Sequence, residues 1–175
     1  MSSTDDPFTQ VYDELWSMLL EDDRFESKVK PGNRIKFNQP DRAPRFTELA
    51  TADYPQVTLI AENITGNLCN TSSTSMLIRR YSWVIASGDF RVNQIFPLEW
   101  AIYAGMLAWR HRLTLLKYPD DNGDLFVKRA NVTDTNFELL ERQREQRGLV
   151  GWVSLWTIEI EMHFTTSSIL GSHLP

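Results

Sequence analysis

Residues 151–164, GWVSLWTIEIEMHF, constrain the fold more than any other stretch of this chain. Successive side chains of a strand point to opposite faces, so every second residue shares a face. One set is apolar except for a serine, and comprises Trp152, Ser154, Trp156, Ile158, Ile160, Met162 and Phe164. The other set begins with Val153 and Leu155 and ends with Glu159, Glu161 and His163. The pattern therefore predicts one long strand with an apolar side against a core and acids on the other side.

Composition narrows the class of protein. The chain has 175 residues, of which 42% are hydrophobic and 23% charged, as in an ordinary globular domain with a real core. The net charge is -5 and no tract is strongly basic, so phosphate-driven DNA binding has little support. A single cysteine, Cys69, excludes a disulfide within the chain. We expect no secretory signal in MSSTDDPFTQ, and no stretch approaches the roughly 20 apolar residues of a membrane span.

Two helices are expected. Asp6 before Pro7 is typical of a helix N-terminus, and apolar spacing continues this helix over about 7–20. The second helix covers FPLEWAIYAGMLAWRHRLTLL, residues 96–116. Its core-facing stripe follows helical spacing and consists of Leu98, Ile102, Met106, Trp109 and Leu113.

Strands account for most of the rest. We expect a short strand at 35–37, then a hairpin of strands at 56–63 and within 75–89, joined by a turn-rich connection. DLFVKRANVTD, residues 124–134, predicts a further strand before the last one. The order predicts a single α+β domain over 1–175, with two helices packed on one face of a mostly antiparallel sheet.

Two segments are expected to leave this framework. An irregular arm at about 38–55 contains three prolines and carries Arg42, Arg45 and Phe46, which we expect to contact a neighbouring subunit or partner. The alternative is a surface loop with no partner. A charged loop is predicted at about 133–150, although its composition also suits a helix. Its candidate contact residues are Arg142, Arg144 and Arg147.

The sequence shows little sign of catalysis. The three histidines have no second ligand at metal spacing, and DDNGD at 120–124 lacks the remaining ligands of a calcium loop. No glycine-rich phosphate loop or nucleophile elbow is present. Glu159 and Glu161 lie on one strand, whereas catalytic carboxylate pairs usually come from different elements. We therefore expect no enzyme activity, no cofactor and no bound metal, and a protein that acts through its surface.

The order of elements suggests a family. An amphipathic N-terminal helix precedes the strands PQVTLI and RRYSWVIASGD, the helix PLEWAIYAGM and the closing strand GWVSLWTIEIEMHF. Over about residues 7–165 this order resembles the tail terminator (tail completion, or neck) proteins of tailed bacteriophages. The resemblance implies a structural virion protein, assembled in the bacterial cytoplasm and located in the phage tail or neck.

The resemblance also implies partners. Such proteins form a ring, usually a hexamer, that ends growth of the tail tube, joins the head-side connector or neck proteins, and lets DNA pass. The tail sheath is a further candidate partner, and no membrane is involved. Glu159 and Glu161 would then face the channel, where they would repel DNA phosphates, or face a neighbouring subunit. The alternative is that they form the solvated face of the sheet. The alternatives are another neck or tail component, such as a head-tail adaptor or tube-like subunit, and a cytosolic binding module or small enzyme.

Overall fold

Five strands form one sheet in the order β1-β2-β3-β5-β4. The computed structural model describes residues 6–36, 55–65, 74–87, 95–117, 124–141 and 149–165. The strands are β1 (Arg34–Lys36), β2 (Gln56–Thr65), β3 (Thr74–Ala86), β4 (Val127–Glu141) and β5 (Leu149–Thr165). The β2–β3, β3–β5 and β5–β4 pairs are antiparallel, and the β1–β2 pair is parallel. The prediction of a mostly antiparallel sheet is confirmed.

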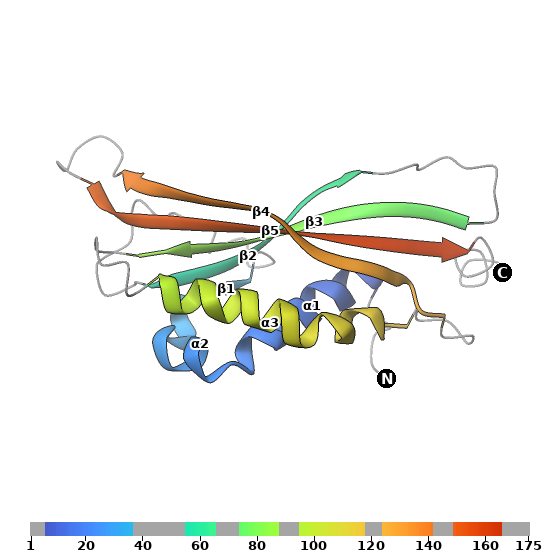
Figure 1. Cartoon of the computed structure of the whole chain (residues 1–175), viewed down its shortest axis with the longest axis horizontal. Helices are drawn as coiled ribbons and strands as arrows, with labels where there is room; N and C mark the ends of the chain where they lie inside the picture. Colours follow the sequence, from blue (N-terminus) through green and yellow to red (C-terminus); the bar gives the residue numbers. More distant parts are fainter. Residues whose placement is uncertain are drawn as a thin grey trace.

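The helices α1 (Pro7–Leu20), α2 (Asp23–Lys28) and α3 (Phe96–Thr114) lie on one side of this sheet, as Figure 1 shows. A single 3-10 turn, Pro31–Asn33, follows α2. Helix α1 covers β2 and β3: the Tyr12 hydroxyl donates to the Leu59 carbonyl at 2.9 Å, and the rings of Trp16 and Trp83 stack with centroids 5.3 Å apart. Helix α3 lies beside α1 and contacts β4. The architecture is thus α+β, with helices on one face.

The core fills the space between the helices and the sheet. Strand β5 contributes Ile158, Ile160 and Met162, each 0% exposed, from the apolar side that its alternation predicted. The buried stripe of α3 contains Leu98, Ile102, Met106 and Leu113, as the spacing predicted. The side chain of Trp109, the remaining member of that stripe, lies outside what the structure describes. Trp83 and Tyr81 of β3 are the largest side chains that are almost fully enclosed.

The predicted bounds hold closely for α1 and less well elsewhere. Helix α1 spans Pro7–Leu20 as expected, whereas the short helix α2 was not predicted. The prediction of a charged loop at about 133–150 is wrong over much of that range, because β4 continues to Glu141 and β5 begins at Leu149. Pairing with β5 supplies backbone partners for this segment, and Phe137 packs on Trp152 with ring centroids 4.8 Å apart. These tertiary contacts outweigh its helix-favouring composition.

Within the described ranges, no helix is both long enough and apolar enough to cross a membrane.

The first turn of α1 depends on one side chain. Asp6 Oδ1 accepts hydrogen bonds from the amides of Phe8 at 2.9 Å and Thr9 at 3.0 Å, and Oδ2 accepts from the Thr9 hydroxyl. Burial opposes ionisation of this carboxyl, but these hydrogen bonds together hold its pKa below the usual value. Because the folded-state pKa is lowered, the stabilisation is present above the unfolded-state pKa and is lost as the pH falls through the folded-state value.

We expect Asp6→Ala to lower the free energy of unfolding at neutral pH by about 1 kcal/mol, because the N-cap acceptor is lost. Asp6→Asn is the matched control, since asparagine caps about as well but carries no charge. Urea titrations of the three proteins at neutral and acidic pH measure both effects. An Asp6→Ala protein as stable as the parent at neutral pH would contradict the assigned cap.

Candidate functional site

The acids predicted on β5 lie on the helix-free face of the sheet, and each has a basic neighbour. Glu159 Oε1 accepts from Arg80 Nε at 2.7 Å and Nη2 at 2.6 Å, across the β3–β5 pair. Glu161 Oε1 lies 2.7 Å from His163 Nε2, and its Oε2 lies 3.9 Å from Arg129 Nε on β4. The two glutamates therefore form cross-strand ion pairs rather than an isolated negative row.

The middle of the same face is polar and closed to solvent. The Ser82 hydroxyl donates to a carboxylate oxygen of Glu62, and Ser82 Oγ lies 3.2 Å from Thr157 Oγ1. Ser82 is 1% exposed and Thr157 7% exposed. Although a serine beside a carboxylate can suggest a nucleophile, this hydroxyl is shielded from any substrate. Its hydrogen bonds instead satisfy polar groups that the sheet buries.

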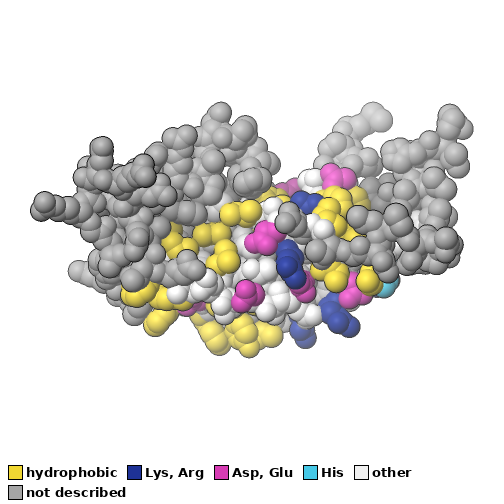
Figure 2. All heavy atoms as spheres, turned by 90° about the horizontal axis from the view of Figure 1, so that it is seen from above, with side chains coloured by type: hydrophobic (Ala, Val, Ile, Leu, Met, Phe, Trp, Pro, Cys, Tyr) yellow, Lys and Arg dark blue, Asp and Glu magenta, His cyan; other side chains and the backbone are white. Residues whose placement is uncertain are grey.

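Charges of both signs alternate over this face. Figure 2, which looks onto the sheet from above, shows acidic and basic side chains next to one another among hydrophobic and neutral ones. Among the described side chains of the face, the acids are Glu62, Asp134, Glu159 and Glu161, and the arginines are Arg80 and Arg129. The ion pairs make this face less negative than the glutamates of β5 alone suggested.

The other predicted contact residues cannot be placed. Arg42, Arg45 and Phe46 of the arm, and Arg142, Arg144 and Arg147 of the charged segment, lie outside the described residues. Their proposed contacts therefore remain predictions.

Helix α3 carries a second apolar row that sequence reasoning missed. At 100° per residue this row lies roughly opposite the buried stripe, with spacing i, i+4, i+7 and i+11. Its members are Phe96, Trp100, Tyr103 and Leu107, which are 53%, 55%, 41% and 55% exposed. Phe137 of β4, 39% exposed, extends the row, with its ring centroid 6.3 Å from that of Phe96. We call these five residues the aromatic strip.

The aromatic strip is fixed to the β4–β5 side of the molecule. The Tyr103 and Trp156 rings meet edge to face at 6.3 Å, and the Trp100 and Tyr103 rings lie 5.7 Å apart. Glu99, one helical position from Trp100, accepts a hydrogen bond from Ser154 of β5. The Trp156 indole donates to Ser154 Oγ at 3.1 Å. These contacts orient the strip without covering it.

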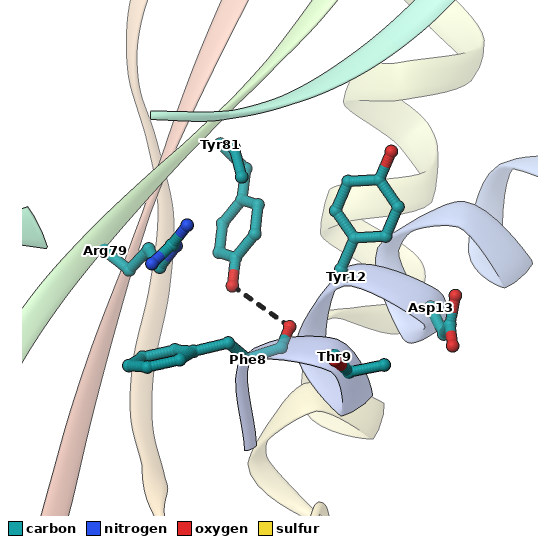
Figure 3. A pocket seen from close by; sticks show the side chains of 7 residues that line it. Phe8, Thr9, Tyr12, Asp13, Arg79 and Tyr81 are labelled. Atoms are coloured by element: carbon teal, nitrogen blue, oxygen red, sulfur yellow. Dashed lines mark hydrogen bonds between the residues drawn. The ribbon is translucent and has the colours of Figure 1, made fainter. Parts of the chain in front are cut away.

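A pocket lies on the helix-covered side of the sheet, where the first turn of α1 meets β2 and β3. Its volume is about 230 Å³. Figure 3 shows Arg79 and Tyr81 of β3 directed toward Phe8 in the first turn of α1. The lining residues are Phe8, Thr9, Tyr12, Asp13, Ala61, Arg79 and Tyr81, and we call this the Arg79 pocket.

Aromatic faces hold the Arg79 guanidinium in place. Its central carbon lies 4.8 Å from the ring centroid of Phe8 and 5.8 Å from that of Tyr81. Its Nε is buried without a hydrogen-bond partner. Burial raises the pKa of the Tyr81 hydroxyl, which therefore stays protonated and donates to the Phe8 carbonyl at 3.3 Å. The pocket thus combines one cation with three aromatic side chains, a composition suited to a flat apolar group.

Comparison of the sequence with protein-family models finds no match, and comparison with curated proteins finds none either. In the parts of the chain that the structure describes, no three His, Cys, Asp or Glu side chains gather as metal ligands. Among the described features, the aromatic strip, the Arg79 pocket and the mixed-charge face are candidates for contact with another molecule.

We expect Trp100→Ala to change the free energy of unfolding by less than about 1 kcal/mol, since surface substitutions have small effects. Trp83→Ala, by contrast, empties a core site that is 2% exposed and should cost about 3–5 kcal/mol. Denaturant titration of both variants and the parent measures the difference. A large cost for Trp100→Ala would mean that the strip supports the fold instead of being available to a partner.

Proposed function

We propose that this chain is a structural subunit that assembles with copies of itself into a ring on the end of a phage tail tube, as tail terminator proteins do. The observation that carries the proposal is the aromatic strip, which exposes half of two aromatic rings and a leucine on one helix. The element order that resembles the family and the α+β architecture are in keeping with it. In the virion, DNA passes through the ring.

An exposed row of this kind is unusual on a protein that acts alone. Single apolar side chains are common at surfaces, but contiguous apolar patches mark interaction sites. The enrichment of Trp, Tyr and Phe at the centres of interfaces points the same way. The strip is held by ring contacts to β4 and β5, so it is ordered before any partner binds. A preordered apolar surface loses little conformational entropy on association.

The same framework suits other neck or tail components, such as a head-tail adaptor, and these remain the nearest alternatives. A small-molecule binding module is favoured less. The Arg79 pocket, at about 230 Å³, is smaller than the roughly 300–1,000 Å³ of typical ligand pockets. Its composition fits a single side chain better than a drug-sized molecule.

We expect the protein to cap tail tubes. The native mass, from light scattering after size exclusion over a range of concentrations, should reach about six times the 20.3 kDa chain, either alone or on the tube. Tubes polymerised with the protein should stop growing, as electron microscopy of their lengths would show. The proposal would be contradicted if tubes grew equally long with and without the protein and bound none of it.

The channel-lining role of Glu159 and Glu161 gives a separate expectation. Replacing both with Gln removes two charges while keeping side-chain size, whereas Lys would also repel Arg80. We expect DNA ejection to slow in phage carrying this pair, because fewer negative charges face the phosphates. Asp23→Asn with Glu26→Gln on α2 is the control for an equal charge change elsewhere. If DNA were ejected at the same rate in both double variants, the proposed channel-lining role of these glutamates would be contradicted.

A further inference from the structure

The aromatic strip and the Arg79 pocket lie at different positions along the strand order of the sheet, on the side that the helices cover. The strip belongs to α3 and β4, which form the near side in Figure 1, and β4 is the last strand of the order. The pocket lies between α1 and the β2–β3 pair, toward the β1 end of the same order. A protein with a projecting group at one position and a receiving site at another can bind copies of itself head to tail.

We infer that the aromatic strip of one copy binds the Arg79 pocket of the next, with Trp100 as the side chain that enters the pocket. The inference rests on the proposed function, whose subunit interface it assigns. Trp100 is the largest side chain of the strip and, with Leu107, the most exposed at 55%. The partner is therefore a second copy of this chain.

Size supports the match. A cavity of about 150 Å³ lined by apolar side chains is enough to hold a benzene ring. The Arg79 pocket, at about 230 Å³, is larger than such a cavity, and the additional volume is enough for the second ring of an indole. Thr9 and Asp13 are the polar residues of its lining besides Arg79 and the two tyrosines.

Chemistry supports the match as well. An indole entering the pocket would meet the Arg79 guanidinium and the rings of Phe8 and Tyr12. A cation beside an aromatic face attracts it, most strongly for tryptophan. Trp, Tyr and Arg are also the residues that most often dominate binding energy at interfaces. Here they are divided between the two surfaces. Trp100 and Tyr103 belong to the strip, and Arg79, Tyr12 and Tyr81 line the pocket.

The exposed area sets how much of an interface the strip supplies. Aromatic side chains bury roughly 150–250 Å² each. With its five members about half exposed, the strip offers on the order of 400–500 Å². A standard interface takes about 800 Å² from each partner, so the strip provides about half. An interface of standard size would take the rest of its area from residues outside the strip.

A head-to-tail contact leaves the same two surfaces free at the ends of every open chain of subunits. Such contacts build a ring where the rotation between copies closes, and a filament where it does not. A two-fold contact of strip with strip would instead use the same surface of both copies and close at two copies. The difference between the two arrangements can be measured with mixtures of variants.

The test uses sedimentation velocity on the full chain, from micromolar to near-millimolar concentration. Trp100→Ala should weaken self-association about thirtyfold, as truncation of a dominant interface residue does. Arg79→Ala should weaken it similarly, and Ala61→Phe should do so by filling the pocket while leaving Arg79 in place. Leu115→Ala, which truncates a side chain that is 62% exposed outside the strip, should change it less than about twofold. Circular dichroism melts show whether each variant is folded.

Mixing the two kinds of variant decides the geometry. Trp100→Ala keeps an intact pocket, and Ala61→Phe keeps an intact strip, so an equimolar mixture should form a 1:1 dimer and nothing larger. Absence of that dimer, with both variants folded, overturns the pairing of strip with pocket.

Two further outcomes separate this inference from the proposed function. Variants that associate as tightly as the parent overturn the inference, while capping of tail tubes by those variants would leave the proposed function intact. A parent protein that is strictly monomeric throughout the range also overturns the inference, because the contact needs only two copies. Failure to cap tubes, with the 1:1 dimer present, would instead overturn the proposed function alone.

Discussion

The structure depends on the double pairing of β5. This strand is bonded to β3 along residues 153–165 and to β4 along most of its length, so its backbone groups find partners on both sides. Its strict alternation fixes the register, because a shift by one residue would send Ile158 and Ile160 to the wrong face. The same register that places Trp83 opposite Trp156 also places Arg80 opposite Glu159. Core packing and surface ion pairs are therefore set together.

The predictable parts of the fold share one property, which is that local sequence and tertiary environment agree. Helix α1 has a capping aspartate, a proline at its start and apolar residues at helical spacing, and its bounds were predicted correctly. The alternation in β5 identified the side that the helices cover. The buried stripe of α3 was found for the same reason. In each case the residues that favour the element locally are those that bury its apolar side.

The parts that were not predicted depend on partners distant in sequence. The end of β4 has the composition of a helix or loop, and its pairing with β5 determines its conformation. The ion pairs of Glu159 and Glu161 could not be anticipated without the register that brings Arg80 and Arg129 beside them. The strip was not predicted because α3 is apolar on two sides, and a single core-facing stripe accounts only for the side that contains Leu98. The Arg79 pocket joins residues more than 70 positions apart, Phe8 and Tyr81.

The two outer strands of the described sheet are the places where another chain could add a strand. Outer strands present unpaired amides and carbonyls that can template amyloid-like growth. Strand β1 pairs with β2 over only three residues, and β4 departs from regular register at three places along β5. Such bulges twist the backbone away from the flat geometry that a further strand needs, and exposed Lys128 and Asp134 add charge there. The bulges and charges of β4 therefore disfavour the addition of a further strand to it through the main chain.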